Sequence, residues 1–289
     1  MKTSIIHALR NGYRLIDTAQ YYGIESVVGA AIRDSGVPRS EITLVTKVWG
    51  HWFHDPAEAL RISLRDLDIE YIDILLMHWP NTMTPEEKPQ PYPGQPPYWE
   101  VWKSLEPLVG DKLKSIGVSN FTQKTLEKLL EVASIIPVVN EVELHALNPN
   151  FKLVPYCLDK GIRVISWSTM GSERHESGKN PILTDDLFVD IAKKHGCSAG
   201  VVSLSWAVQR GVTVIPKSSK SHRIDENIRL VTLDENDMQS IASASDKLGR
   251  MCLCDRITGI QYEVDGKTTI LGWSKQDFGW IDDEGNWLT

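Results

Sequence analysis

The chain has 289 residues, of which 42% are hydrophobic and 24% charged, and its formal net charge is −7. This composition is typical of a globular protein with enough apolar side chains for a large core, and it excludes extensive disorder. Because the net charge is negative, broad electrostatic attraction to nucleic acid or to an anionic membrane is disfavoured. An anionic ligand therefore needs a local binding site.

The cysteines and the N-terminal segment indicate a reducing, cytoplasmic setting. Four cysteines, Cys157, Cys197, Cys252 and Cys254, fit neither a disulfide framework nor a zinc pattern, because only the last two are close and C-x-C alone is a weak signal. No segment approaches the roughly 18 apolar residues of a membrane span, and a histidine and an arginine interrupt the opening residues where a signal peptide is apolar. We expect a monomer or weak oligomer.

Helical and extended segments alternate along the chain. A helix is expected over residues 4–10, where apolar residues have helical spacing and Asn11-Gly12 supplies a stop. Apolar, β-branched runs predict strands over residues 14–18, 42–48, 73–78, 115–119, 138–144, 163–168 and 212–216. Amphipathic stretches predict helices over residues 25–35, 56–67, 99–108, 124–133, 154–160 and 187–195.

This alternation predicts an α/β protein with one parallel sheet covered by helices. Seven β units without a glycine-rich dinucleotide fingerprint favour a (β/α) barrel over a doubly wound sheet. A proline-rich insert over residues 81–97 follows the third strand, and we expect it to border the ligand pocket. We expect residues 1–289 to form a single barrel domain, in which residues 250–289 are a tail without clear periodicity.

Four polar residues, Asp17, Tyr22, Lys47 and His78, lie at or just past the ends of the first three strands. In a parallel sheet these ends share one rim, so an acid, a phenol, an amine and an imidazole converge there. Tyrosine has a reference pKa of about 10, and a nearby ammonium lowers it. The set is suited to moving a proton at a carbonyl oxygen. Taken singly, Asp17 fits a helix cap, Lys47 a surface amine and His78 a core histidine.

Five ordered blocks are similar to those of the aldo-keto reductases. They are GYRLIDTAQYYG at 12–23, LVTKVW at 44–49, DILLMHWP at 73–80, IGVSNF at 116–121 and VIPKSSKSHRIDEN at 214–227. The resemblance extends to about residue 250. It implies a (β/α)8 TIM-type barrel that binds NADP(H) and reduces a small-molecule aldehyde or ketone to an alcohol.

The resemblance also implies roles for the polar set and its neighbours. Tyr22 resembles the proton donor, Lys47 and Asp17 its activating pair, and His78 the residue that orients the carbonyl. Trp49 and Trp79 are candidates for the substrate pocket wall, although such aromatic residues are equally often plain packing.

Cofactor contacts follow from the same blocks. Ser119 and Asn120 resemble residues that hydrogen-bond the nicotinamide carboxamide, and Trp167, followed by Ser168, stands where an aromatic side chain faces the nicotinamide ring. Further along, Lys217, Ser218 and Arg223 are expected around the 2′-phosphate, with Glu226 and Asn227 nearer the adenine. A lysine and an arginine that both bind the 2′-phosphate would favour NADP(H) over NAD(H). A solvated basic loop is the alternative for this last segment.

Two departures from the family pattern stand out. Glu141 occupies a position where the family has glutamine, so the amide donor to the carboxamide is lost and a charge enters a partly buried site. An ionised Glu141 beside the nicotinamide would favour the oxidised ring and weaken NADPH preference. In addition, residue 1 opens in the helix that follows the family's N-terminal hairpin and first barrel strand, which predicts an N-terminally shortened member with lower stability and impaired cofactor binding.

Three further readings remain open from the residues. The strand-like stretch VDGKTTILGW at 264–273 is an alternative filler for the opening in the barrel. A catalytically impaired, nucleotide-binding barrel that serves as a regulatory or partner subunit is the alternative function. A more remote alternative function is that of an aldolase-like barrel in which Lys47 forms a Schiff base with the substrate.

Overall fold

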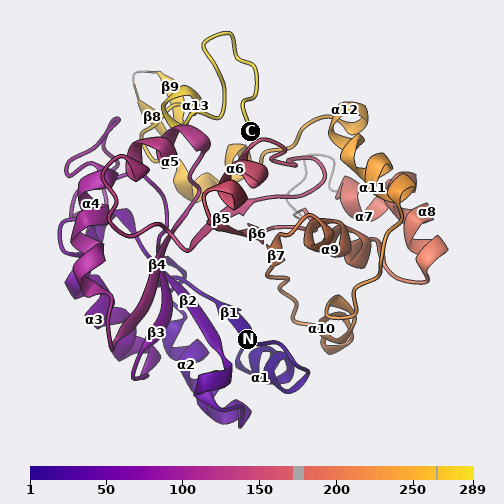
Figure 1. Cartoon of the computed structure of the whole chain (residues 1–289), viewed down its shortest axis with the longest axis horizontal. Helices are drawn as coiled ribbons and strands as arrows, with labels where there is room; N and C mark the ends of the chain where they lie inside the picture. Colours follow the sequence, from indigo (N-terminus) through magenta and orange to yellow (C-terminus); the bar gives the residue numbers. More distant parts are fainter. Residues whose placement is uncertain (172–178, 265) are drawn as a thin grey trace.

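Seven parallel strands form one sheet in chain order in the computed structural model, which describes residues 1–171, 179–264 and 266–289 (Figure 1). The strands are β1 (Leu15–Asp17), β2 (Thr43–Val48), β3 (Ile72–Met77), β4 (Leu113–Ser119), β5 (Val139–Glu143), β6 (Arg163–Trp167) and β7 (Thr213–Val214). Each strand pairs with its neighbours in sequence, from β1–β2 through β6–β7. The sheet is the curled sheet of a (β/α) barrel, as the sequence predicts.

Helices between successive strands cover the outside of the sheet, and further helices precede β1 and follow β7 (Figure 1). They are α1 (Lys2–Arg10), α2 (Glu25–Ser35), α3 (Pro56–Leu67), α4 (Tyr98–Leu105), α5 (Gln123–Leu130), α6 (Leu153–Asp159), α7 (Pro181–Thr184), α8 (Asp186–His195), α9 (Ala199–Gln209), α10 (Ser221–Asn227), α11 (Glu235–Ala242), α12 (Ala244–Leu248) and α13 (Lys275–Phe278). Local signals set their ends: the Asp55 side chain accepts a hydrogen bond from the Glu58 amide at the start of α3, and Pro56 occupies its first turn.

The two faces of the sheet pack into two separate apolar clusters. Leu44, Leu75 and Ile116 pack outward with helix residues such as Ile32 in the main core. Val45, Leu76, Val139 and Ile165 form a second buried cluster, against which Leu15, Ile74, Val138 and Ile215 pack. Because side chains alternate between the faces of a strand, this second cluster marks the inside of the barrel.

The sheet ends at β1 and β7, and within the described residues the tail does not join these two strands. The strand-like stretch at 264–273 was one predicted filler for the opening, and this prediction is wrong. Its residues 267–270 form β9 (Lys267–Ile270), which pairs instead with β8 (Gln261–Val264) in an antiparallel arrangement. Helices bridge the opening: His7 Nε2 on α1 lies 2.6 Å from Asp225 Oδ1 on α10, and the Tyr13 hydroxyl donates to the Ile224 carbonyl at 2.9 Å.

The tail lies beside α5, at the top of the view in Figure 1. The Thr122 hydroxyl donates to the Phe278 carbonyl at 2.5 Å, and Lys124 Nζ donates to the Gln276 carbonyl at 2.8 Å. Pro89 of the 81–97 insert lies against this tail, because a Cβ atom on Gly272 would lie 3.2 Å from it. Among the described residues, no helix is long and apolar enough to cross a membrane.

Candidate active site

The polar residues at the strand ends share the inner face of the sheet. Each is two positions beyond a residue of the inner apolar cluster, so the alternation of the strand carries it to the same side. The pairs are Leu15 and Asp17, Val45 and Lys47, Leu76 and His78, Val139 and Glu141, and Ile165 and Trp167. The site is therefore the layer directly above the apolar filling of the barrel, at the carboxyl ends of the strands, where barrel enzymes place their chemistry.

Lys47 is the centre of this layer. Its side chain is completely buried, and its Nζ lies 2.5 Å from Asp17 Oδ1 and 3.1 Å from Glu141 Oε1. A third bond goes to the Thr18 carbonyl at 3.1 Å. Burying an ammonium is costly unless it is paired and hydrogen-bonded, and here two carboxylates and a carbonyl meet that need. Lys47 is a fixed buried charge, not a surface amine.

The buried surroundings shift the pKa values of both Lys47 and Glu141. Burial alone lowers the pKa of Lys47, but attraction to Asp17 and Glu141 outweighs burial and raises that pKa well above its ordinary value. Burial and the nearby Asp17 raise the pKa of Glu141 to about 8, against the opposing pull of Lys47. One of its oxygens, Oε2, is buried and has no hydrogen-bond partner among the described residues. Glu141 thus holds its proton to a higher pH than an ordinary carboxyl group, while Lys47 keeps its own proton.

Tyr22 and His78 stand over this buried charge. Tyr22 ends the 3-10 turn η1 (Gln20–Tyr22) and is 45% exposed, with Lys47 Nζ 5.4 Å from the centre of its ring. Burial around its hydroxyl raises the pKa of Tyr22 to about 12, while Lys47 pulls it down. The His78 ring lies edge-on to Tyr22 at 5.7 Å, and burial together with Lys47 holds the pKa of His78 well below its ordinary value. At neutral pH the site presents a neutral phenol and a neutral imidazole.

The aromatic candidates have different neighbours. Trp49 is buried, stacks on Tyr21 with ring centres 4.1 Å apart and meets the His78 ring at 5.0 Å, so it adjoins the polar set. Trp79 is buried against the tail, 5.8 Å from the Phe278 ring and 6.3 Å from that of Trp280. Trp49 thus faces the candidate chemistry, whereas Trp79 packs against the tail.

Residues at the ends of β4 and β6, and directly after them, form the next part of the rim. The Asn120 amide donates to the His78 carbonyl at 2.9 Å, and its oxygen accepts from the Trp167 indole at 3.0 Å. The Ser119 hydroxyl donates to the Glu141 carbonyl at 2.9 Å. Asn120 and Ser168 have φ values of 63° and 53°, in a left-handed region that is unusual for side-chain-bearing residues and common at functional sites. These bonds fix the predicted nicotinamide contacts relative to His78.

The predicted phosphate contacts follow β7, the last strand of the sheet. Lys217 follows β7 in an exposed loop, Ser218 is half-buried in that loop, and Arg223 is exposed on α10. Glu226 accepts from the Ser198 amide at 3.1 Å, and Asn227 is buried at the end of α10. Both predicted cations are therefore exposed to solvent.

The contact between Glu141 and Lys47 is the main feature that the sequence prediction missed. Glu141 was assigned only to the cofactor, yet its carboxylate reaches the lysine from three strands away. Inner-face alternation was the available signal, because Lys47 and Glu141 each follow an inner apolar residue by two positions. Tyr21 was also missed; it is as exposed as Tyr22 and covers Trp49.

Comparisons with known proteins point to one family. The profile of the aldo/keto reductase family matches residues 2–246. A D-galacturonate reductase of Hypocrea jecorina is 38% identical over 262 residues, covering 86% of this chain and 83% of the relative. A glycerol 2-dehydrogenase (NADP(+)) of Saccharomyces cerevisiae is 38% identical over 266 residues, with 85% and 83% covered. The crystal structure of a Bombyx mori aldo-keto reductase in complex with NADP superposes with a TM-score of 0.76 at 30% identity, covering 86% and 87%.

Proposed function

The chain belongs to the aldo/keto reductase family of oxidoreductases, and we propose that it reduces an aldehyde or ketone to an alcohol with NADP(H). The observation that carries this proposal is the buried ammonium of Lys47, paired with Asp17 and placed under the ring of Tyr22. A phenol over a fixed positive charge is suited to give its proton to an oxygen that becomes negative.

The residues on the rim fit an extended dinucleotide. Lys217 and Arg223 offer two exposed cations for a phosphate, and Ser119 and Asn120 offer polar groups beside His78 for an amide. Trp167 offers an aromatic face, although its indole N–H is already bonded to Asn120. When bound, the reduced cofactor supplies the hydride.

In this proposal Tyr22 supplies the proton, and His78 orients the carbonyl group of the substrate. His78 is neutral and lies beside Tyr22, so we assign it the hydrogen bond that orients the carbonyl oxygen. As the carbonyl carbon gains a hydride, its oxygen takes the Tyr22 proton, and the tyrosinate that remains is stabilised by Lys47. Proton donation of this kind typically contributes about 10²–10⁴-fold to the rate.

The Schiff-base reading of Lys47 has little support. A lysine that attacks a carbonyl must be neutral, and such lysines have lowered pKa values. Asp17 and Glu141 raise the pKa of Lys47 and hold its proton. Lys47 is therefore suited to act as a fixed charge.

The alternative of a nucleotide-binding barrel with little turnover rests on Glu141. Its carboxylate shares Lys47 with Asp17 and, when ionised, raises the pKa of Tyr22, which makes the phenol a weaker acid. The experiment is a fluorescence titration with NADPH, followed by a panel of sugar and short-chain aldehydes in which NADPH oxidation is recorded. Oxidation of NADPH with at least one aldehyde is expected. Tight NADPH binding with no oxidation across the panel would favour the binding protein instead.

We also propose that residues 250–289 belong to the same domain as the barrel and complete the wall of the pocket. Trp79, directly after His78, packs against Phe278 and Trp280 of this segment, and the Met251 amide donates to the Leu147 carbonyl at 2.9 Å. Substrate choice is then set by the tail together with the 81–97 insert. All four cysteines are free thiols, as in a reducing compartment.

A further inference from the structure

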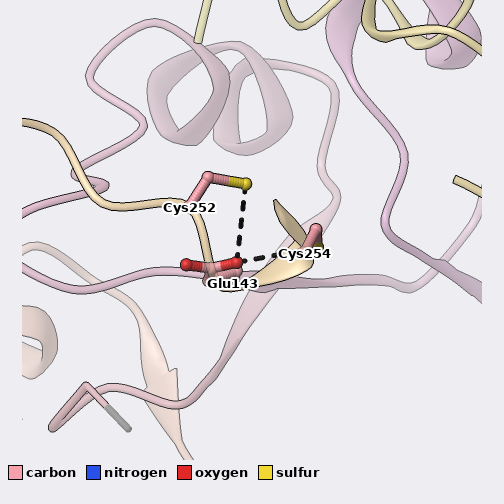
Figure 2. A group of neighbouring side chains, drawn as sticks. All are labelled: Glu143, Cys252 and Cys254. Atoms are coloured by element: carbon pink, nitrogen blue, oxygen red, sulfur yellow. Dashed lines mark hydrogen bonds between the residues drawn. The ribbon is translucent and has the colours of Figure 1, made fainter. Parts of the chain in front are cut away.

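Glu143, Cys252 and Cys254 form a buried cluster between β5 and the tail (Figure 2). Glu143 is the last residue of β5, one inner-face position beyond Glu141. The two sulfur atoms approach the same carboxylate oxygen: Cys252 Sγ lies 3.9 Å from Glu143 Oε2 and Cys254 Sγ lies 3.7 Å from it. Cys252 and Cys254 lie 109 and 111 positions after Glu143 in the sequence, so it is the fold of the tail that brings the thiols to the carboxylate.

We propose that Glu143, Cys252 and Cys254 bind one zinc ion, which fastens the tail to the barrel. A tetrahedral zinc ion with Zn–S bonds of about 2.3 Å and Zn–O bonds of about 2.0 Å separates sulfur from oxygen by roughly 3.5 Å. The observed separations of 3.7 and 3.9 Å exceed this by a few tenths of an ångström, and all three ligand atoms lie within 4.8 Å of one another. Two thiolates favour zinc over the hard cations magnesium and calcium.

A cavity supplies room for a fourth ligand. Glu143, Cys252 and Cys254 all line a cavity of about 30 Å³, whose walls also include Asn148 and Asn150. A site needs roughly 10–15 Å³ of such space to hold one water molecule. The three protein ligands plus one water complete the tetrahedral coordination that zinc prefers.

The surroundings already hold the carboxylate in place. The Leu253 amide donates to both Glu143 oxygens, at 2.8 and 3.0 Å, and His145 Nε2 lies 3.0 Å from Oε1. Groups of this kind, one layer behind the ligands, fix the orientation of a metal-binding carboxylate. Two thiolates and one carboxylate leave a zinc site with one net negative charge. Arg250 is partly buried nearby and is attracted electrostatically to Cys252 and Glu143, which offsets this charge.

Without a metal, the two cysteines are thiols that carry their protons. The thiols then act as weak donors to Glu143, as the two contacts in Figure 2 show. Binding zinc replaces two S–H bonds with two Zn–S bonds and releases two protons, with no oxidant required. The exchange converts two weak hydrogen bonds into a crosslink between β5 and the residues that begin the tail.

The test uses the full chain and Co²⁺ or Zn²⁺ alone, so it does not depend on turnover or on NADPH. We expect one equivalent of Co²⁺ to give a near-ultraviolet sulfur-to-cobalt charge-transfer band that Zn²⁺ abolishes. The band should be lost in the Cys252→Ser/Cys254→Ser variant and reduced in Glu143→Gln. In the matched control, Cys197→Ser, it should be unchanged, because Cys197 lies outside the cluster.

The spectrum of the wild-type protein tests the zinc site even if a variant does not fold. Absence of a cobalt–thiolate band in folded wild-type protein, checked by circular dichroism, would overturn the proposal. So would a band that persists in the folded double serine variant. A melting temperature that rises with one equivalent of Zn²⁺ in the wild type and in Cys197→Ser, but not in the double variant, would support the role in fastening the tail.

Discussion

The two ends of the proposed cofactor site are built in opposite ways. At the chemical end, Lys47 is completely buried and shares its charge with Asp17 and Glu141 inside the barrel. At the phosphate end, Lys217 and Arg223 project into solvent from a loop and a short helix beyond a strand of two residues. Charges in the first group depend on one another because little water screens them, whereas charges in the second are hydrated and screened by salt.

Because of this difference, substitutions at the two ends should affect the stability of the fold and the affinity for the cofactor differently. Changes at the chemical end should alter both the fold and the reaction, since every buried charge there has a partner that would be left unpaired. Changes at the phosphate end should alter cofactor affinity and leave the fold intact, because exposed positions contribute little to stability. Substitutions at each end test this contrast.

The largest effect is expected from Lys47→Met. This substitution leaves Asp17 and Glu141 facing each other without a cation, so the free energy of unfolding should fall by about 3–5 kcal/mol. Turnover should fall at least about 10²-fold, because the charge that stabilises the Tyr22 anion is lost. Urea denaturation and NADPH oxidation measure the two effects. Lys114→Met, on an exposed position of β4, is the control, and equal effects of the two substitutions would contradict the contrast.

A smaller, pH-dependent effect is expected from Glu141→Gln. The pKa of Glu141 is raised in the folded state to about 8, so the wild type gains stability from this group at low pH and loses it as pH rises toward and through 8. Between pH 5 and 9, wild-type stability should fall relative to Glu141→Gln by roughly 2–4 kcal/mol. Urea denaturation of both proteins across this range measures the difference. Parallel profiles would show that Glu141 is ionised throughout and that its pKa is not raised by burial.

The smallest effect is expected at the phosphate end. Arg223→Ala should weaken NADPH binding about tenfold, since it removes one charge-assisted contact, and should leave NADH binding unchanged. Its unfolding free energy should stay within about 0.5 kcal/mol of the wild type. Fluorescence titrations with both cofactors measure this, with Arg229→Ala, exposed just past α10, as the control. Equal weakening for NADPH and NADH would show that Arg223 does not contact the 2′-phosphate.

Much of the framework could be predicted from the sequence, because local signals are strong there. The bounds of α2 and α3 match the expected 25–35 and 56–67, and the seven strands lie within a few residues of their predicted ranges. By contrast α9 was missed. Nearly all of its residues are buried, so it lacks the polar face that reveals an amphipathic helix.

Contacts across the barrel could not be predicted in the same way. The pairing of Glu141 with Lys47 depends on how far the sheet curls, which no local pattern specifies. The cluster of Glu143 with Cys252 and Cys254 joins β5 to a tail whose path has no periodic signal. Long-range contacts of this kind carry the site's electrostatics, whereas the framework that positions them is encoded locally.

The adjacent residues Tyr21 and Tyr22 allow the most direct test of the central claim, that Tyr22 donates the proton over Lys47. Both are about half-exposed, but only Tyr22 stands over the ammonium, while Tyr21 stacks on Trp49. Single-turnover oxidation of bound NADPH by an aldehyde is the measurement, for Tyr21→Phe and Tyr22→Phe side by side. We predict a loss of about 10²–10⁴-fold in Tyr22→Phe with NADPH affinity retained, and a rate near that of the wild type in Tyr21→Phe. An unchanged rate in Tyr22→Phe would contradict the assignment of Tyr22 as the proton donor.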